Sequence, residues 1–360
     1  MRNSTLKFFR GKKILVTGAT GFKGSWLCLW LYSLGSKVYA LGYNPNQNKK
    51  LFSQLNLKKK INLKILDIRK YEATSKYINK IKPDIIFHLA AQPLIYESYK
   101  NPFLTYQVNS LGTLNLLEIL RKKKYKPKSV IFITSDKCYE SNNSTIGFTE
   151  DDKLGGVDPY SGSKATAEIM VKSYYNSFFK KNKIGMATAR AGNVIGGGDW
   201  SENRLIPDAI RCLKNNKKII LRNPKFNRPW QHVLEPLYGY LILAKKLYSN
   251  PKKYSGPWNF GTKQNTVTSV EEIIKKIIYY WGYGNFFSHK KTRYYEQENL
   301  QLNINKASKK LKWFPKLTID QSVELTTSWY YQALNTKKTI EEITLKQIAL
   351  FQSINENKKK

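Results

Sequence analysis

The sequence predicts an α/β protein with a doubly wound parallel sheet and a smaller, discontinuous C-terminal domain. Two observations carry this prediction. Short apolar runs of strand length alternate with amphipathic stretches of helix length through about the first 190 of the 360 residues. A glycine-rich turn, Gly18, Gly21 and Gly24, stands between the first run and the first stretch. Strands that alternate with helices need crossover connections, and these place the strands parallel in one sheet.

The strands are predicted from short apolar runs bounded by polar or turn-forming residues. Ile14-Leu15-Val16 and Ile85-Ile86-Phe87 are clear examples, and both are apolar throughout, as expected for strands covered on two faces. In chain order the predicted strands are residues 13–17, 37–41, 63–66, 84–89, 129–134 and 184–189.

Four helices are predicted between these strands. Residues 22–34 follow the glycine turn and carry a face of Trp and Leu, and residues 71–81 are amphipathic. Residues 102–123 and 159–180 each begin with proline, which is favoured in the first turn of a helix.

The glycine turn predicts a dinucleotide site in a Rossmann-type fold. Gly18 permits the tight turn, Gly21 lets the backbone approach a pyrophosphate, and Gly24 lets the helix pack close to the sheet. Phe22 and Lys23 complete the turn, and the N-terminus of the helix offers N–H groups to the phosphates.

Other residues expected at the cofactor follow later strands. Strand 37–41 is followed by Gly42, Tyr43 and Asn44, with neither an acid nor an arginine, so this position leaves NAD and NADP both open. Asp67 and Ile68 either contact the adenine or cap the next helix. Small residues in the segment Leu89-Ala90-Ala91 would let the chain pass beneath the cofactor.

The domain boundaries follow from where the alternation stops. We predict an NAD-binding domain of residues 1–190 plus about 229–257, and a substrate domain of residues 191–228 and 258–340 that closes over the carboxyl edge of the sheet. Residues 341–360 are expected to form a Lys-rich tail. A surface helix with a frayed end is the favoured interpretation of the tail, with a partner-binding role as the alternative.

The composition excludes several classes of protein. The net charge is +37, but lysine supplies 52 of the 62 basic residues and is scattered, whereas planar phosphate and base recognition favours arginine. We therefore expect no nucleic-acid partner, although a basic surface would attract an anionic substrate. No apolar run approaches the roughly 18 residues of a membrane span, and residues 1–13 lack the pattern of a signal peptide. Cys28, Cys138 and Cys212 are odd in number and widely spaced, which indicates reduced thiols and a cytoplasmic protein without a zinc site.

Tyr160 and Lys164 form a candidate catalytic pair. Residues four apart on a helix share one face, and a lysine ammonium near a phenol is expected to lower the pKa of the phenol. Tyr160 could then act as a general base near neutral pH.

With the glycine turn about 140 residues upstream, this pair resembles the extended short-chain dehydrogenase/reductase family. The resemblance implies NAD as cofactor, and Ser135 as a third catalytic member that hydrogen-bonds the sugar 4-hydroxyl; a polar cap on the strand is the alternative. Thr134 lies beside it at the cofactor. Asn109 matches the structural Asn of the family, with an ordinary helix-surface amide as the alternative.

Asp136 and Lys137 then point to dehydration. In related 4,6-dehydratases this pair is Asp-Glu, and the Asp-Lys found here resembles one subgroup, the CDP-glucose 4,6-dehydratases, over the run TSDKCYE at residues 134–140. Gly162 departs from the resemblance, which leads us to expect Ser there. Other matching runs are GFKGSW at 21–26, HLAAQPL at 88–94, RAGNVIGGGDW at 190–200 and RPWQHV at 228–233.

The resemblance implies a mechanism in which Tyr160 takes the proton of the 4-hydroxyl while C4 is oxidised. Lys137, if neutral, removes the C5 proton, and Asp136 protonates the departing 6-hydroxyl. An alternative is that Lys137 gives electrostatic support while another base or water acts at C5. The substrate would be a CDP-sugar and the product would serve deoxysugar biosynthesis, such as that of lipopolysaccharide O-antigen.

Candidate substrate residues are chosen for the charge and shape of a nucleotide sugar. Arg204 and Arg228 would hold the diphosphate, and Asn193 and Gln92 would contact the substrate. His232 either touches the ribose or base or is structural, and His88 is expected to be structural, with no metal-ligand cluster around the histidines.

Three further expectations complete the set. A homodimer would form through helices 102–123 and 159–180, as is the habit of the family. A dehydratase for another nucleotide or a nucleotide-sugar 4-epimerase is the alternative within the fold. A non-catalytic basic protein that binds NAD or nucleic acid is the alternative outside it, and the intact Ser135, Tyr160 and Lys164 argue against that alternative.

Overall fold

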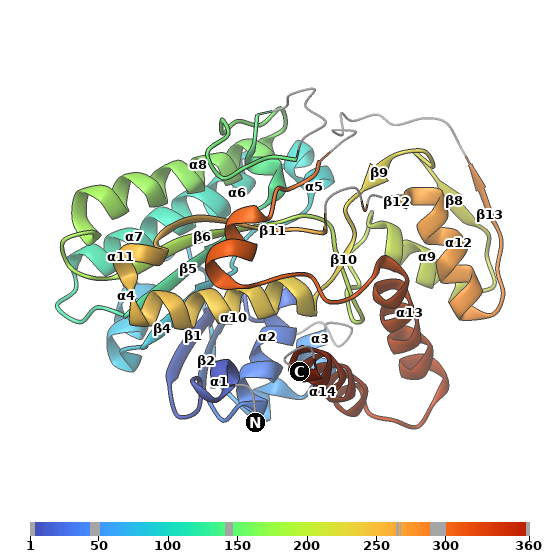
Figure 1. Ribbon diagram of the computed structural model, residues 1–360, viewed down its shortest axis with the longest axis horizontal. Coiled ribbons are helices and arrows are strands. Elements are labelled where there is room, and N and C mark those ends of the chain that lie inside the picture. Colours follow the sequence, from blue (N-terminus) through green and yellow to red (C-terminus); the bar gives the residue numbers. More distant parts are fainter. Residues whose placement is uncertain are drawn as a thin grey trace.

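The computed structural model describes residues 4–43, 51–140, 147–263, 266, 268–288 and 300–357. At its centre lies a seven-stranded sheet with the strand order β11-β6-β5-β4-β1-β2-β3 (Figure 1). Every pairing within this sheet is parallel. The predicted fold class is therefore confirmed.

The six predicted strands are present, with ends that move by one or two residues. The seventh strand, β11, was not predicted because Gly256 and Pro257 at its start are poor strand formers. It pairs at the edge of the sheet with β6. The strands are β1 Lys13–Thr17, β2 Lys37–Gly42, β3 Asn62–Ile65, β4 Ile85–His88, β5 Ser129–Ile133, β6 Gly185–Ala191 and β11 Gly256–Phe260.

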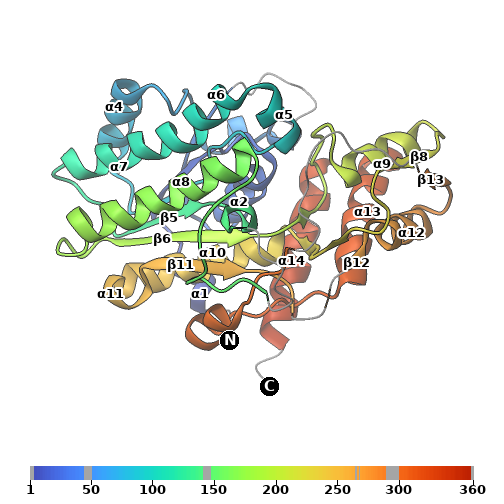
Figure 2. The same ribbon diagram turned by 90° about the horizontal axis from the view of Figure 1, so that it is seen from above.

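Helices cover both faces of the sheet, as Figure 2 shows. One face carries α2 (Phe22–Ser33) and α10 (Leu234–Ser249), and the other carries α4 (Tyr71–Ile81), α7 (Gly112–Lys122) and α8 (Pro159–Tyr174). Alternate residues of β1 serve the two layers. Ile14 and Val16 pack in the cluster that contains α2, whereas Leu15 packs in the cluster that contains α7. The uniformly apolar strands follow from this double coverage.

The predicted helix 102–123 is interrupted by a π-turn. It consists of α6 (Pro102–Tyr106), the π-turn Gln107–Leu111 and α7. The predicted helix 159–180 likewise ends in a π-turn, Tyr175–Phe179, after α8. Single π-turns often occur at functional positions in a helix.

The second region lies beyond the carboxyl end of β6 (Figure 2). Its described residues form the helices α9 (Leu205–Lys214), α12 (Val270–Trp281) and α13 (Ile319–Asn335). Three small two-stranded sheets accompany them: β7 Val194–Ile195 with β10 Gln231–His232, β9 Asn227–Arg228 with β12 Thr268–Ser269, and β8 Ile219–Leu221 with β13 Phe286–Ser288.

The C-terminal helix α14 (Ile340–Asn357) packs on α2, the first of the helices that cover the sheet. Ile343, Ile348 and Phe351 are buried, and the ring of Phe351 meets that of Trp30 at 6.0 Å. The surface helix expected here therefore has one buried face. This cover also explains why α2 is buried from Gly24 to Leu31 rather than along one stripe.

Short helices complete the described fold. They are α1 Ser4–Lys7, α3 Leu51–Gln54, α5 Ile95–Lys100, α11 Pro251–Tyr254, the 3₁₀ turns Leu57–Lys59 and Asp136–Cys138, and the π-turn Ala307–Leu311. Within the described residues, none of the helices has the length and apolar character required to cross a bilayer.

Candidate active site

The turn between β1 and α2 has the geometry that a dinucleotide pyrophosphate needs. Gly18 has a φ of +67°, and a Cβ there would lie 2.6 Å from the backbone nitrogen of Ala90. A Cβ on Gly24 would lie 2.3 Å from the carbonyl oxygen of Gly18. α2 starts after Gly21 without a side-chain cap. Close packing and uncapped N–H groups together fit the pyrophosphate of a dinucleotide.

A buried histidine fixes the segment that passes beneath this turn. The Oγ1 atom of Thr17 lies 2.8 Å from Nδ1 of His88 and accepts a hydrogen bond from the backbone of Ala90 at 3.2 Å. Burial, aided by the charge of Lys164, lowers the pKa of His88 to about 3, so the ring is neutral. This supports the structural role expected for His88.

Asn109, in the π-turn between α6 and α7, ties the same segment to α8. Its Oδ1 accepts from the backbone of Gln92 at 2.8 Å, and its Nδ2 donates to Oγ of Ser163 at 2.9 Å. The side-chain amide of Gln92 is itself bonded to Leu94 and Thr105. Both N–H groups of this amide are therefore engaged, and its Oε1 keeps one lone pair for a substrate donor.

The predicted catalytic pair lies on the buried face at the start of α8. Asp158 caps this helix by accepting from the backbone of Ser161 at 3.0 Å. Tyr160 and Lys164 are both buried, one helical turn apart. The Nζ atom of Lys164 donates to the carbonyl oxygen of Ile133, at the end of β5, over 3.2 Å.

The pKa expected for the phenol is corrected by the structure. Burial raises the pKa of Tyr160 to about 12, and a hydrogen bond with Ser135 offsets this only in part. Lys164 does not supply the expected lowering, because burial brings its own pKa down to about 8 and its ammonium is directed at a carbonyl oxygen. Desolvation therefore outweighs the lysine charge in the protein alone.

Ser135, Asp136 and Lys137 lie in a short turn that follows β5 and faces Tyr160. Ser135 Oγ donates to Oδ1 of Asp136 at 2.8 Å and accepts from the backbone of Lys137 at 3.2 Å. The other carboxylate oxygen of Asp136 is buried and has no hydrogen-bond partner among the described residues. It lies 3.2 Å from the position a Cβ on Gly192 would take. A buried oxygen without a partner is suited to contact a substrate.

Lys23 of the glycine turn also belongs to this centre. Burial, together with the positive charges of Arg204 and Lys164, lowers the pKa of Lys23 to about 8, although the carboxylates of Asp136 and Asp199 oppose the change. The sequence predicted Lys23 as a cofactor residue, but gave no signal for its proximity to Asp136.

Asp67, predicted at the adenine, is bound by an arginine that the sequence did not single out. Arg69 donates to both carboxylate oxygens of Asp67, with Nε at 3.0 and 2.9 Å. Partial burial alone would raise the pKa of Asp67, but the bonds from Arg69 outweigh burial and lower it. Asp67 does not cap α4, which starts after Lys70 without a side-chain cap. The neighbouring Ile68 is buried against Gly112. Of the residues after β2, Asn44 lies outside the described ranges.

The two predicted diphosphate arginines lie on different elements. Arg204 stands at the start of α9, where it pairs with Asp199 at 3.0 Å and reaches the carbonyl oxygen of Pro93 at 3.4 Å. Its charge acts on both Lys23 and Tyr160. Arg228 is buried in β9, with its guanidinium 5.2 Å from the ring centre of Phe226.

The remaining predicted substrate residues differ in their surroundings. Asn193 is partly buried beside β7, where its carbonyl oxygen accepts from the backbone of Gln231 at 3.0 Å. His232 is fully buried, with its ring 5.9 Å from that of Trp26. Burial lowers the pKa of His232 to about 3, so the ring is neutral; its Nδ1 accepts from the backbone of Leu234 at 3.4 Å, whereas its Nε2 has no hydrogen-bond partner among the described residues.

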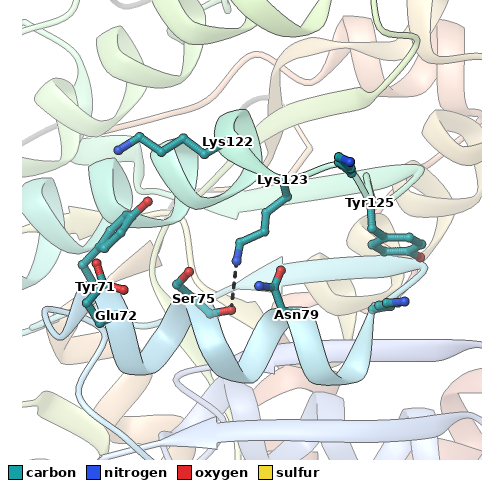
Figure 3. A pocket seen from close by; sticks show the side chains of 9 residues that line it. Tyr71, Glu72, Ser75, Asn79, Lys122, Lys123 and Tyr125 are labelled. Carbon is teal, nitrogen blue, oxygen red and sulfur yellow. Dashed lines mark hydrogen bonds between the residues drawn. The ribbon is translucent and has the colours of Figure 1, made fainter.

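A surface hollow elsewhere is separate from this constellation. Lys123 Nζ donates to the carbonyl oxygen of Ser75 across it at 3.4 Å (Figure 3). None of the predicted site residues lines it; the lining residues are Tyr71, Glu72, Ser75, Asn79, Lys82, Lys122, Lys123, Lys124 and Tyr125. Within the described ranges, no three or more His, Cys, Asp or Glu side chains gather where they could hold a metal ion.

Comparison with known proteins gives a consistent picture. Residues 15–326 match the sequence profile of the family described as GDP-mannose 4,6 dehydratase. The chain is 41% identical to a CDP-glucose 4,6-dehydratase of Salmonella typhimurium over 329 residues, which are 90% of this chain and 91% of that protein.

Two solved structures share the fold. A UDP-glucose 4-epimerase of Thermotoga maritima, solved with UDP-glucose, has a TM-score of 0.77 at 22% identity and covers 89% of this chain and 99% of its own. A dTDP-glucose 4,6-dehydratase of Bacillus anthracis, solved in complex with NAD, has a TM-score of 0.75 at 23% identity and covers 89% and 97%. The sequence profile, the Salmonella relative and the shared architecture confirm the resemblance deduced from the motifs. The chain belongs to the GDP-mannose 4,6 dehydratase family.

Proposed function

We propose that this protein is an NAD-dependent CDP-glucose 4,6-dehydratase, which converts CDP-D-glucose to CDP-4-keto-6-deoxy-D-glucose and water. The observation that carries the proposal is the turn that places Asp136 and Lys137 directly after Ser135, beside Tyr160. A 4-epimerase needs no acid and base at this point, whereas elimination of water across C5 and C6 needs both. The 41% identity to the Salmonella CDP-glucose enzyme supports the choice of nucleotide.

The glycine turn and the N-terminus of α2 would hold the pyrophosphate of NAD. Ala90 and Ala91 are partly buried next to Gly18 and would lie along the cofactor. NAD supplies the oxidation of C4 and the return of the hydrogen at C6, so it ends each turnover as it began. The NAD complex of the Bacillus dehydratase supports NAD over NADP. The ion pair between Arg69 and Asp67 supports it too, because Asp67 already neutralises the cation that the 2′-phosphate of NADP would use.

Oxidation at C4 requires a base for the 4-hydroxyl proton, and Tyr160 takes this role with Ser135 as its hydrogen-bond partner. Because burial holds the pKa of Tyr160 near 12, positive charge close to the phenol must favour the phenolate before the proton can move. Arg204 across the site, whose charge already lowers the pKa of Tyr160, is the cation placed to do so.

Elimination requires a second base and an acid on the same sugar. The 4-keto group acidifies the C5 proton, which Lys137 removes as the base and returns to C5 when hydrogen is restored at C6. Asp136 gives a proton to the departing 6-hydroxyl through the carboxylate oxygen that has no partner among the described residues. Asp136 is close enough to Lys23 for its carboxylate to raise the pKa of that lysine.

Substrate binding is assigned to the second region. Arg204 and Arg228 would neutralise the diphosphate, because paired guanidinium N–H groups match phosphate oxygens. Asn193, between β6 and β7, would contact the sugar.

The assembly we infer is a homodimer through α6, α7 and α8. Several apolar side chains on these helices are exposed, and Phe103 and Ile169 have the highest exposed fractions, 73% and 55%. A four-helix interface would cover them. We also place the protein in the cytoplasm, where its cysteine thiols, unpaired in the described residues, would stay reduced. Its product would serve deoxysugar biosynthesis, including that of lipopolysaccharide O-antigen.

The test is incubation of the purified protein with CDP-glucose, dTDP-glucose or GDP-mannose, with and without added NAD+, and analysis of the products by mass. The proposal predicts loss of one water from CDP-glucose, faster than from the other two. A product of unchanged mass would identify an epimerase, and preference for another nucleotide would refute the CDP assignment.

A further inference from the structure

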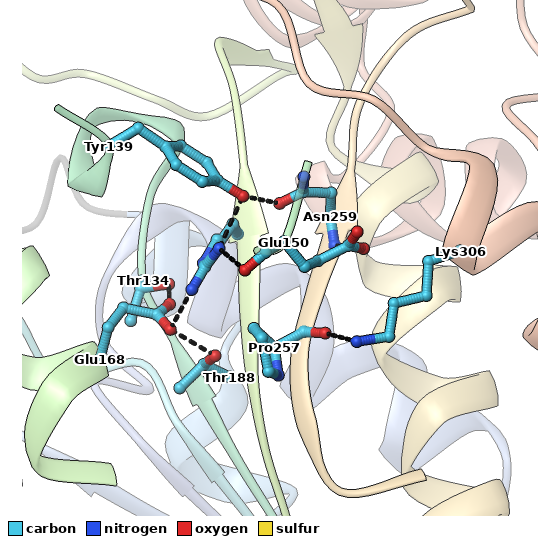
Figure 4. A network of polar contacts seen from close by, with 9 residues as sticks. Thr134, Tyr139, Glu150, Glu168, Thr188, Pro257, Asn259 and Lys306 are labelled. Carbon is cyan, nitrogen blue, oxygen red and sulfur yellow. Dashed lines mark hydrogen bonds and ion pairs between the residues drawn. The ribbon is translucent and has the colours of Figure 1, made fainter. Parts of the chain in front are cut away.

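A buried ion pair joins the catalytic helix to β6 next to the catalytic turn, and Figure 4 shows its Glu168 bonded to Thr134 and Thr188. Glu168, on α8 one turn after Lys164, pairs with Arg190 of β6 at 2.8 Å. Their side chains are 3% and 2% exposed. Burial in itself lowers the pKa of Arg190, but Glu168 outweighs burial and raises it, so the guanidinium stays charged.

This pair holds the catalytic turn at both of its ends. Thr134, just before Ser135, donates to Oε1 of Glu168 at 2.5 Å. The hydroxyl of Tyr139, just after Cys138, accepts a hydrogen bond from Nη1 of Arg190 at 2.6 Å. Between these two anchors lie Asp136 and Lys137, which carry the elimination chemistry, and Ser135, which is the hydrogen-bond partner of Tyr160.

Further hydrogen bonds join the network to more distant parts of the chain. The hydroxyl of Tyr139 donates to Oδ1 of Asn259, on β11, at 2.7 Å. Asn259 in turn donates to the carbonyl oxygens of Phe148 at 2.8 Å and Asn303 at 3.3 Å. We call these residues the Arg190 network; its members are Thr134, Tyr139, Glu168, Thr188, Arg190 and Asn259.

Stability alone does not explain such an arrangement. A buried ion pair contributes little over well-packed apolar residues of similar volume, because both charges lose their hydration. The planar guanidinium, in contrast, fixes the directions of its partners closely. Those partners are the helix that carries Tyr160 and Lys164 and the turn that carries Asp136 and Lys137.

We propose that the Arg190 network is a positioning device that sets the elimination pair, Asp136 and Lys137, against the oxidation pair, Tyr160 and Lys164. This inference rests on the proposed dehydratase function. The members of the network act through the turn and the helix, and none of them touches the reacting atoms. Loosening the Tyr139 anchor should therefore slow elimination while oxidation at C4 continues.

The probe is Tyr139→Phe, which removes the hydroxyl that joins Arg190 to Asn259 and keeps the ring. The matched control is Thr344→Val on α14, which removes another fully buried hydroxyl, one that accepts from Nε1 of Trp329 at 2.9 Å. Both changes leave a buried polar group without a partner, so both lower the thermal midpoint. Only the first change touches the anchor of the catalytic turn.

Three measurements follow on the holoenzyme with CDP-glucose and on the protein alone. The network predicts that Tyr139→Phe forms product about tenfold to a hundredfold more slowly, as expected for a misplaced catalytic group. It also predicts that enzyme-bound reduced cofactor accumulates during turnover. Without ligand, amide hydrogen exchange of residues 134–140 should be faster than in wild type, while that of α8 is unchanged. Thr344→Val should match wild type in all three.

The inference is overturned if Tyr139→Phe slows oxidation and elimination by the same factor, or if its turnover and exchange match those of Thr344→Val. Should Tyr139→Phe not fold, Thr188→Val removes another hydrogen bond of the Arg190 network, the one to Oε2 of Glu168 at 2.7 Å, and is held to the same outcomes. A wild-type protein that dehydrates none of the nucleotide sugars refutes the proposed function instead, so the two failures are distinct.

Discussion

Gly24→Ala tests the cofactor turn at the position where the backbone is most crowded. The new Cβ would lie 2.3 Å from the carbonyl oxygen of Gly18 and 2.8 Å from Cα of Ala19, and both obstacles are backbone atoms. The turn must therefore shift, and overpacking of this kind costs about 1–3 kcal/mol of stability. A shifted turn also misdirects N–H groups that would face the pyrophosphate.

The size of the binding defect follows from the bonds at risk. A hydrogen bond to a charged group contributes about 1.5–3 kcal/mol. Since about 1.4 kcal/mol corresponds to a factor of ten, losing one such bond raises the Kd for NAD about tenfold to a hundredfold. Isothermal titration with NAD and thermal unfolding of the same preparation measure the two effects.

A second glycine substitution separates folding from binding. Gly282, just after α12, has a φ of +97° with no atom near the position of a Cβ. In Gly282→Ala, backbone strain alone should lower the free energy of unfolding by about 1–2 kcal/mol, and the Kd for NAD should be unchanged. NAD affinity that is normal in Gly24→Ala, or equally reduced in Gly282→Ala, would refute our account of the turn.

Three more outcomes are expected. Lys137→Met should leave C4 oxidation intact and abolish elimination, whereas Tyr160→Phe should slow oxidation itself by about 100-fold to 10,000-fold. The absorbance of the reduced cofactor and the mass of the product measure both steps. A full dehydration rate in Lys137→Met would reject the assigned base. Ile169→Glu should convert a dimer to a monomer in sedimentation at micromolar concentration, and a monomeric wild type would remove the dimer. Burial lowers the pKa of His232 from 6.5 to about 3. Because the unfolded state then takes up a proton at higher pH than the folded state, the free energy of unfolding falls as pH drops from about 6.5 toward 3. That fall should be smaller in His232→Leu. Denaturant titrations in which the free energy of unfolding falls with pH by the same slope in both proteins would contradict this prediction.

Local patterns were enough to predict the parts of the fold that depend on local chemistry. The glycine turn was found because close approach at Gly18 and Gly24 allows no side chain, and that requirement is visible in the residues themselves. β11 was missed because a strand with Gly256 and Pro257 forms only where β6 offers it an edge. The buried face of α14 was missed for the same reason, since it forms only where α2 and α13 lie against it.

The candidate site shows the same division. Spacing placed Tyr160 and Lys164 on one helix face, but it could not give the balance between burial and charge that leaves the pKa of Tyr160 near 12. The contact between Asp67 and Arg69 joins residues two apart, so a local search could have found it. The pairing of Glu168 with Arg190 depends on how α8 lies against β6, which no sequence spacing encodes.

The central claim is that one active site oxidises C4 and then eliminates water across C5 and C6 of CDP-glucose. The most direct test is incubation of the wild-type protein with NAD+ and CDP-glucose that carries deuterium at C4, followed by mass spectrometry of the product. We predict a product that has lost one water and retains the deuterium, now on C6. An unchanged mass, or a dehydrated product whose deuterium has exchanged with solvent, would contradict the account.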